Sequence, residues 1–141
     1  MSSGDAGDSV VVSQLGARMH YAVPRILAGA GRLERLYTDI CAVKGGPRML
    51  AAMPPAALPG PLRRLAGRVP HGINRDRISC FPALGIASVF RTRFDKSRAR
   101  ETETALRAGR AFSAGVVRRG FGRAGGFYGF SGECLEQLAA A

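Results

Sequence analysis

The chain has 141 residues, of which 46% are hydrophobic and 22% are charged. These are globular values, so they exclude a disordered chain, and the length predicts one domain with a substantial core rather than two. The formal net charge of +11 favours anionic partners, although net charge concerns association and not chemistry.

The positive charge is unevenly distributed. Residues 44–123 contain seventeen of the 21 basic residues and four of the ten acidic ones. One interpretation is a surface for phosphates, anionic lipids or nucleic acid. The other is that biased base composition alone has produced an arginine-rich chain. The pattern leaves both open.

The N-terminus and the cysteines favour a cytoplasmic protein. Residues 1–9 are polar and acidic, which is typical of a disordered tail and not of a secretory or transit signal. No apolar run approaches the roughly 18–20 residues that a membrane span needs, so we expect any membrane contact to be peripheral. Cys41, Cys80 and Cys134 are far apart and match no metal motif. We therefore expect reduced thiols and no metal.

The first elements are a strand, a turn and a helix. Val10–Leu15 is rich in β-branched residues and predicts a buried strand. Gly16–Arg18 would form the turn. The composition then favours a helix from His20 to about Ala28, but proline is tolerated only in the first turn of a helix. Pro24 therefore requires that the helix begin near residues 21–23 or be kinked there.

The middle of the chain predicts two more strands around a loop. In Leu33–Ile40, alternation places Leu36 and Tyr37 on opposite faces of a strand. Residues 45–61 contain five prolines and predict a loop with one helical turn near 48–53, followed by a short helix at Pro61. Arg77–Phe81 predicts the next strand.

The last third predicts a helix, a strand and a second helix. Between Ser97 and Arg119, four apolar residues lie within one helical arc: Leu106, Phe112, Val116 and Val117. Residues 127–130, FYGF, predict an aromatic strand. We expect Ser131 or Gly132 to cap a final helix, with Glu133 in its first turn.

The alternation of strands and helices predicts the fold class. It favours an α/β fold in residues 10–141, with a Rossmann-like parallel sheet, right-handed crossovers and helices on both faces. The final helix runs out in LAAA without a stop signal. We therefore expect the chain to end before its domain does.

The turn after the first strand is the candidate binding site. In parallel α/β sheets, this turn commonly meets a phosphate, because helix amides and the helix dipole point at it. Gly16 would let the backbone approach a ligand, and Arg18 would add charged donors. The segment lacks both G-x-G-x-x-G and a P-loop, so a tight turn without a ligand is the alternative.

His20 and Asp39 are weaker candidates. A histidine one turn from the loop suits proton transfer, but no carboxylate nearby in sequence orients His20, and a helix-surface histidine without function is the alternative. Asp39 lies at the end of the second strand, where dinucleotide-binding proteins place a ribose-binding acid, yet the glycine motif of those proteins is missing.

Three segments carry a resemblance to a known family: VVVSQLGARMHYAVPRIL, LERLYTDI and FYGFSGECLEQL. With them the chain resembles the N-terminal part of bacterial group 1 glycosyltransferases, also called family 4. These enzymes have the GT-B architecture, in which two Rossmann-like domains face a cleft. The resemblance covers nearly the whole chain, although the segments mark a subgroup and are not catalytic signatures.

The resemblance implies a transferase that moves a sugar from a nucleotide-sugar donor to a sugar or lipid-linked acceptor without a separate cofactor. Gly16, Ala17 and Arg18 would then lie near the donor diphosphate, with His20 in the cleft. The family often has two adjacent glycines in this turn, whereas only Gly16 is present here. The family's donor site belongs to a C-terminal domain that these 141 residues lack, so we expect them to be inactive alone.

Two other classes compete with the transferase. A small basic α/β binding module for nucleic acid or anionic membrane would explain the charge of residues 44–123 directly. However, aromatic residues make up only 7% of the chain and tryptophan is absent, and no nucleic-acid-binding signature appears, so we expect no specific nucleic acid. A complete single-domain nucleotide-binding enzyme would need a phosphate loop, which is missing.

Overall fold

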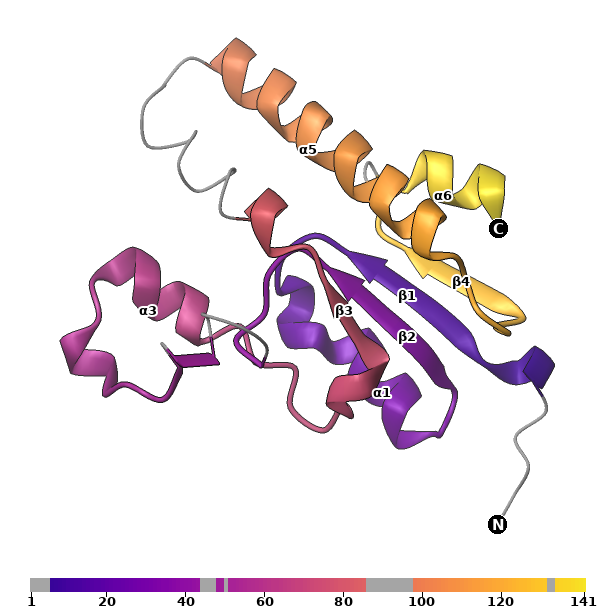
Figure 1. The fold of residues 1–141 in the computed structure, drawn as a ribbon, viewed down its shortest axis with the longest axis horizontal. Helices are drawn as coiled ribbons and strands as arrows, with labels where there is room; N and C mark the ends of the chain where they lie inside the picture. The colour runs from indigo at the N-terminus through magenta and orange to yellow at the C-terminus, as the bar shows by residue number, and fades with distance from the viewer. Residues whose placement is uncertain (1–5, 44–47, 50, 86–97, 132–133) are drawn as a thin grey trace.

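The computed structural model describes residues 6–43, 48, 49, 51–85, 98–131 and 134–141 (Figure 1). Four strands form one sheet: β1 (Val10–Gln14), β2 (Leu33–Thr38), β3 (Ile78–Cys80) and β4 (Gly126–Gly129). The α-helices with defined bounds are α1 (Ala22–Gly29), α3 (Gly60–Ala66), α5 (Arg98–Arg119) and α6 (Leu135–Ala140). The described residues also form short 3-10 turns: η1 (Ala6–Asp8), η2 (Arg18–Tyr21), η3 (Pro55–Ala57) and η4 (Arg75–Arg77).

The sheet is parallel throughout and has the order β3-β2-β1-β4. β1 lies between two neighbours, so that Val12 is paired with Leu36 of β2 and with Tyr128 of β4. In Figure 1, α1 covers one face of the sheet, while α5 and α6 lie on the other. The structure therefore confirms the predicted α/β fold, with a Rossmann-like parallel sheet and helices on both faces.

Each face of the sheet has its own apolar core, because successive side chains of a strand point to opposite faces. On the α1 side the buried cluster consists of Val12, Tyr21, Leu33, Leu36, Cys41, Ile73 and Ile78. On the α5 side it consists of Val11, Tyr37, Phe112 and Val116. Leu36 and Tyr37 thus lie on opposite faces, as their alternation predicts.

Aromatic packing joins α5 to the sheet. The Phe81 ring lies edge-on to Phe112, with 5.5 Å between the ring centroids, and 6.2 Å from the ring of Tyr37. A Cβ atom on Gly115 would lie 2.5 Å from a ring carbon of Phe81. A glycine in the middle of this helix is therefore explained by the close approach of the ring.

Several local predictions are confirmed. Pro24 is the third residue of α1, so the helix begins where the proline permits, and Gly31 follows its end with a φ of +72°. Pro61 is the second residue of α3. Arg48 and Met49 are helical, as the expected single turn requires.

Two predictions about the helices are wrong. Leu106 and Val117 were placed in the apolar arc of α5, but 54% and 38% of these residues are exposed. In Figure 1 the N-terminal part of α5 extends beyond the sheet. The final helix begins at Leu135 with Cys134 as its N-cap, and not at Ser131. Gly132 and Glu133 lie outside the described residues.

The N-terminal residues, the cysteines and the lengths of the helices bear on the remaining sequence predictions. Residues 1–5 of the expected tail lie outside the described residues, and residues 6–8 form η1, where Asp8 makes an ion pair of 2.5 Å with Arg32. Cys41 and Cys134 are buried, and Cys80 is half-buried; all three are thiols. Within the described ranges, none of the helices combines the length and apolar character that crossing a bilayer requires.

Many arginines hold the fold together, which the charge pattern did not predict. Arg63 donates to the carbonyls of Pro55 and Leu58, and Arg77 donates to the carbonyl of Leu33. Arg119 donates to the carbonyl of Cys80 and stacks over a phenylalanine ring. A planar guanidinium with five donors suits such multiple contacts. The count of basic residues in residues 44–123 therefore does not measure a surface available to an anion.

Candidate functional site

The turn that follows β1 lies where the strand order reverses. The chain passes from β1 to β2 and β3 on one side of the sheet, and then returns to place β4 on the other side of β1. Ligands of open parallel sheets bind outside the carboxyl ends of the strands at such a point. Gly16, Ala17 and Arg18 follow the end of β1, and Phe130 follows the end of β4. The predicted site residues are thus at the edge that the fold class favours.

The glycine in this turn is explained by backbone conformation. Gly16 has a φ of +74°, a region that glycine adopts without strain. A Cβ atom there would meet nothing within 4 Å, so crowding is not the cause. The Gly16 carbonyl accepts a hydrogen bond of 3.0 Å from the side-chain amide of Gln14. A hydrogen bond within the protein therefore holds the turn in place. This is also what we expect if Gly16–Arg18 is a tight turn that binds no ligand.

Asp39 holds the turn to the neighbouring strand. Its Oδ1 accepts a hydrogen bond of 2.9 Å from the Gly16 amide and one of 3.3 Å from the Thr38 hydroxyl. Its Oδ2 faces Arg68 at 3.3 Å. Both carboxylate oxygens thus have partners inside the protein. This is the geometry of a positioning residue, which does not favour the ribose-binding interpretation of Asp39.

Three consecutive residues after the turn adopt left-handed backbone conformations. Met19 and His20 have φ values of 50°, and Tyr21 has a φ of 58°. Such conformations cost roughly 1–3 kcal/mol each for residues other than glycine, and they concentrate at functional sites. Met19 and His20 are exposed, while Tyr21 is buried in the core on the α1 side. The buried ring anchors a strained loop that presents its two preceding side chains to solvent.

Arg18 bridges the two sides of the switch point. Its guanidinium carbon lies 5.5 Å from the centroid of the Phe130 ring, the range of a cation–π contact. Ala17 contributes to the core on the α1 side, and its carbonyl accepts a hydrogen bond of 3.0 Å from the His20 amide. Arg18 and His20 are thus the predicted site residues whose side chains are presented outward.

The start of α1 is poorly built for an anion. The η2 turn separates Gly16 from the helix, and the Ala22 amide already donates to the Met19 carbonyl. Pro24, in the first turn, has no amide hydrogen to donate. The amide cradle expected of a strand-to-helix turn is therefore incomplete here. Anion recognition at this edge would depend on side chains.

Burial of Tyr21 links the site to pH. Desolvation raises the pKa of its hydroxyl well above the ordinary value, and the charges of Cys41 and Asp39 raise it further. Burial also raises the pKa of Tyr37. Above about pH 10, the unfolded chain therefore releases protons that the folded chain keeps, and stability falls as the pH rises.

We expect Tyr21→Phe to flatten this alkaline loss of stability. A tyrosine whose hydroxyl stays protonated only in the folded chain contributes a slope of up to about 1.4 kcal/mol per pH unit, so removing the Tyr21 hydroxyl should remove its share of the slope. Urea unfolding between about pH 9 and about pH 11 measures it. Tyr128→Phe, at an exposed position, is the control and should retain the full slope. Identical slopes for both variants would contradict the assignment.

Sequence reasoning missed several residues around the site. Gln14 ends a buried strand with a polar side chain, which was a usable signal because buried polar groups normally have a structural partner. Phe130 closes the aromatic run after β4. Nothing in the sequence marked Arg68 as a site residue, because it contacts Asp39 only in the folded chain. The Gln14 Oε1 atom is buried and accepts no hydrogen bond from the described residues.

Neither a metal site nor a comparison with known proteins identifies a family for this chain. Among the described residues, no three or more His, Cys, Asp or Glu side chains gather in a way that could hold a metal ion. Comparison of the chain with protein-family models, with curated proteins and with solved structures gives no match. The structure by itself shows a Rossmann-like α/β domain, with the candidate residues at the switch point of its sheet.

Proposed function

We propose that this chain forms one wall of the cleft of a glycosyltransferase that transfers a sugar from a nucleotide-sugar donor to an acceptor. In this proposal Gly16 and Ala17 shape the turn beside the donor, while Arg18 and His20 face its phosphates. In such a cleft, transition-state stabilisation needs groups from both walls.

The observation that carries the proposal is the position of Arg18. A guanidinium held over Phe130 at the carboxyl edge of β1 and β4 provides charged donors where parallel sheets bind ligands. His20 adds a second exposed side chain, whose ring nitrogens can form hydrogen bonds, on a backbone held in a sparsely populated conformation. Together they favour a phosphate-bearing ligand.

The small number of free backbone amides after β1 limits the affinity that we expect for a nucleotide sugar. Because Gly16 gives its amide hydrogen to Asp39 and Pro24 has none, the chain offers mainly two side chains to a diphosphate. One or two charge-assisted hydrogen bonds contribute about 1.5–3 kcal/mol each. We therefore expect millimolar affinity for a nucleotide sugar.

Nuclear magnetic resonance titration of the 15N-labelled chain with UDP-glucose or GDP-mannose tests this proposal. The amides of residues 16–20 and 130–131 should shift at millimolar ligand. Arg18→Gln should weaken binding severalfold to tenfold, whereas Arg25→Gln, an exposed arginine on α1, is the matched control and should not. Micromolar affinity, absence of shifts at this edge, or equal effects of the two variants would contradict the proposal.

The same proposal includes a cytoplasmic location and peripheral contact with the inner face of a membrane through residues 44–123. The membrane contact is supported by the exposed arginines along α5, including Arg107, Arg110 and Arg118, of which Arg107 is paired with Glu103 at 2.5 Å. Anionic headgroups attract such basic surfaces at about 1 kcal/mol per residue. A binding module for nucleic acid has no further observation in its favour.

A further inference from the structure

β4 is an edge strand, and the side of its backbone that faces away from β1 pairs with no strand among the described residues. The Gly126 amide donates to the carbonyl of Ser9, which directly precedes β1, at 3.1 Å. Because the backbone groups of successive strand residues point to opposite sides, those of Phe127 and Gly129 point away from β1. Residues 124–131 contain no charged residue and no proline, which are residues that protect such an edge.

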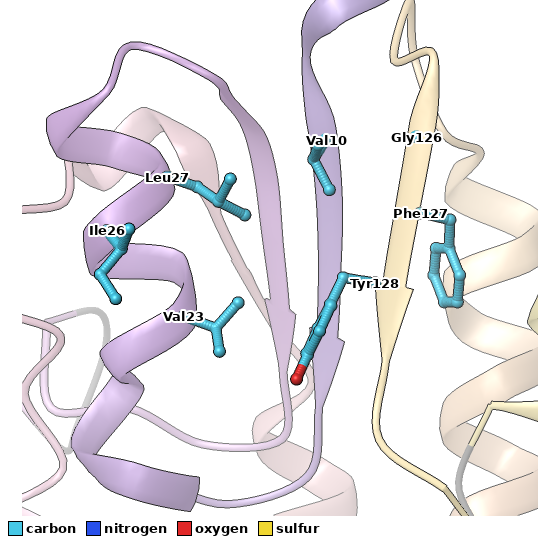
Figure 2. A pocket seen from close by; sticks show the side chains of 7 residues that line it. All are labelled: Val10, Val23, Ile26, Leu27, Gly126, Phe127 and Tyr128. Carbon is cyan, nitrogen blue, oxygen red and sulfur yellow. The ribbon is translucent and has the colours of Figure 1, made fainter.

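Exposed apolar side chains flank this edge on both faces of the sheet. On the α1 side, an uncharged groove of about 320 Å³ lies between α1 and β4, and its lining includes the exposed side chains of Ile26 and Tyr128 (Figure 2). On the other side, Figure 1 shows α6 beside α5, where β4 ends the sheet. Leu135 and Leu138 of α6 are 78% and 56% exposed. Apolar surface around an open strand edge is typical of an interaction surface.

We propose that β4 pairs antiparallel with β4 of a second copy of this chain, which joins the two sheets across a two-fold axis beside Tyr128. In this register Phe127 of each copy exchanges hydrogen bonds with Gly129 of the other, so the outward backbone groups of β4 all gain partners. An axis beside Phe127 would instead place Gly129 opposite Gly125, which precedes the strand. The pairing is isologous and closes at two copies. It does not rest on the proposed function.

The side chains around β4 are compatible with this register. Directly opposite residues of paired strands have their side chains on the same face, so each Phe127 ring lies opposite a glycine and Tyr128 lies opposite its own counterpart. Aromatic residues pack well in both arrangements. On the α5 side of the sheet, the axis brings α6 of one copy beside α6 of the other. The exposed Leu135 and Leu138 side chains then gain apolar neighbours.

The charges at the two ends of β4 favour a second copy as the occupant of this edge. Arg123 is exposed before the start of β4, and Glu136 is exposed in the first turn of α6, which follows the end of β4. Antiparallel pairing places the start of each strand beside the end of the other, so Arg123 of each copy is on the same side as Glu136 of the other. The two ends therefore attract each other, and residues 124–131 between them carry no charge that could repel.

Sedimentation equilibrium of the purified chain, from micromolar to millimolar concentrations, should show a reversible monomer–dimer equilibrium. Tyr128→Asp places two like charges opposite each other at the axis and should weaken dimerisation about tenfold or more. Leu62→Asp on α3 is the matched control, because Leu62 is 38% exposed and Tyr128 is 39% exposed. Figure 1 shows α3 on the opposite side of the molecule from β4. This control should dimerise like the parent chain.

Tyr128→Cys tests the register of the pairing. The Tyr128 backbone groups point toward β1, so the two copies of this residue form a pair without hydrogen bonds, with Cα atoms about 4.5 Å apart. This separation lies within the range of a disulfide. With oxidised glutathione as the oxidant, Tyr128→Cys should form a covalent dimer on a non-reducing gel. The parent chain and Leu62→Cys should not.

Leu138→Gln tests the contact between the two α6 helices. It should weaken dimerisation about tenfold, because an apolar side chain that is exposed in the monomer is covered in the dimer. Leu106→Gln on α5 is the matched control, since Leu106 is exposed to nearly the same extent. It should leave the dimer unchanged.

Each of the other outcomes overturns the proposal. A chain that stays monomeric at millimolar concentration excludes pairing with a second copy and leaves the edge to a strand of another protein. A dimer that Tyr128→Asp and Leu138→Gln both leave intact has a different interface. Equal disulfide yields from Tyr128→Cys and Leu62→Cys exclude an axis beside Tyr128. Because Tyr128 and Leu138 are exposed, all these variants should fold.

Discussion

Phe112→Ala will lower the free energy of unfolding by about 3–5 kcal/mol, the range for large aromatic truncations in a core. The side chain is fully buried between α5 and the sheet, and it is the edge-on partner of Phe81. Truncation leaves a cavity and also removes the support of the ring that packs on Gly115. Chemical denaturation of the purified chain measures the loss.

The matched control is Leu106→Ala on the same helix. Leu106 is 54% exposed, so its truncation should change stability by no more than about 0.5 kcal/mol. The pair tests the corrected position of α5 directly. If Leu106→Ala lowered the free energy of unfolding as much as Phe112→Ala, Leu106 would have to be buried with the rest of the predicted apolar arc. The described packing of α5 would then be wrong.

Asp39→Ala will cost about 2–3 kcal/mol because it leaves the Gly16 amide, the Thr38 hydroxyl and the Arg68 guanidinium without their acceptor. The half-buried Gly16 amide loses its 2.9 Å hydrogen bond, and Arg68 loses its ion-pair partner. Asp39→Asn keeps an oxygen for the Gly16 amide and loses the charge, so about 1 kcal/mol is expected. The alanine variant should also abolish the UDP-glucose shifts at residues 16–20, since the turn would no longer be held.

Asp76→Ala supplies the comparison for this series. Asp76 is an exposed aspartate in η4, and surface substitutions of this kind usually stay within about 0.5 kcal/mol. Its variant should retain the shifts at the turn. Equal stabilities of the Asp39 and Asp76 variants would show that Asp39 does not organise the site.

The sequence predicted those parts of the fold that depend on local chemistry. The β-branched run at Val10–Leu15 and the alternation around Leu36 identify strands, because such residues fit a pleated, buried surface. Pro24 limited the start of α1 because a proline has no amide to donate. The exposure of Leu106 could not be predicted in this way: helical periodicity identifies an apolar face but not how far the sheet beneath it extends.

The sequence predicted where the candidate site lies, but not the side-chain contacts and backbone conformations that form it. The alternating pattern placed Gly16–Arg18 at the carboxyl edge of the sheet, as observed. The contact between Arg68 and Asp39 and the left-handed residues 19–21 arise from tertiary packing, which no local propensity encodes. Tyr128 read as one residue of an aromatic strand, and only the pairing of β4 with β1 shows that it lines a groove.

The strand order also has a consequence for how the chain folds. β1 is an inner strand of the sheet, and on one of its two edges Val10 pairs with Gly126, which lies far along the chain. Closing so long a loop costs conformational entropy before the strand contacts contribute any stabilising free energy. Pairings of this kind therefore form late and slowly. During synthesis, one edge of Val11 and Val12 therefore stays unpaired until Phe127 and Tyr128 have been made. We expect folding intermediates that lack β4 to expose this apolar edge and to depend on chaperones.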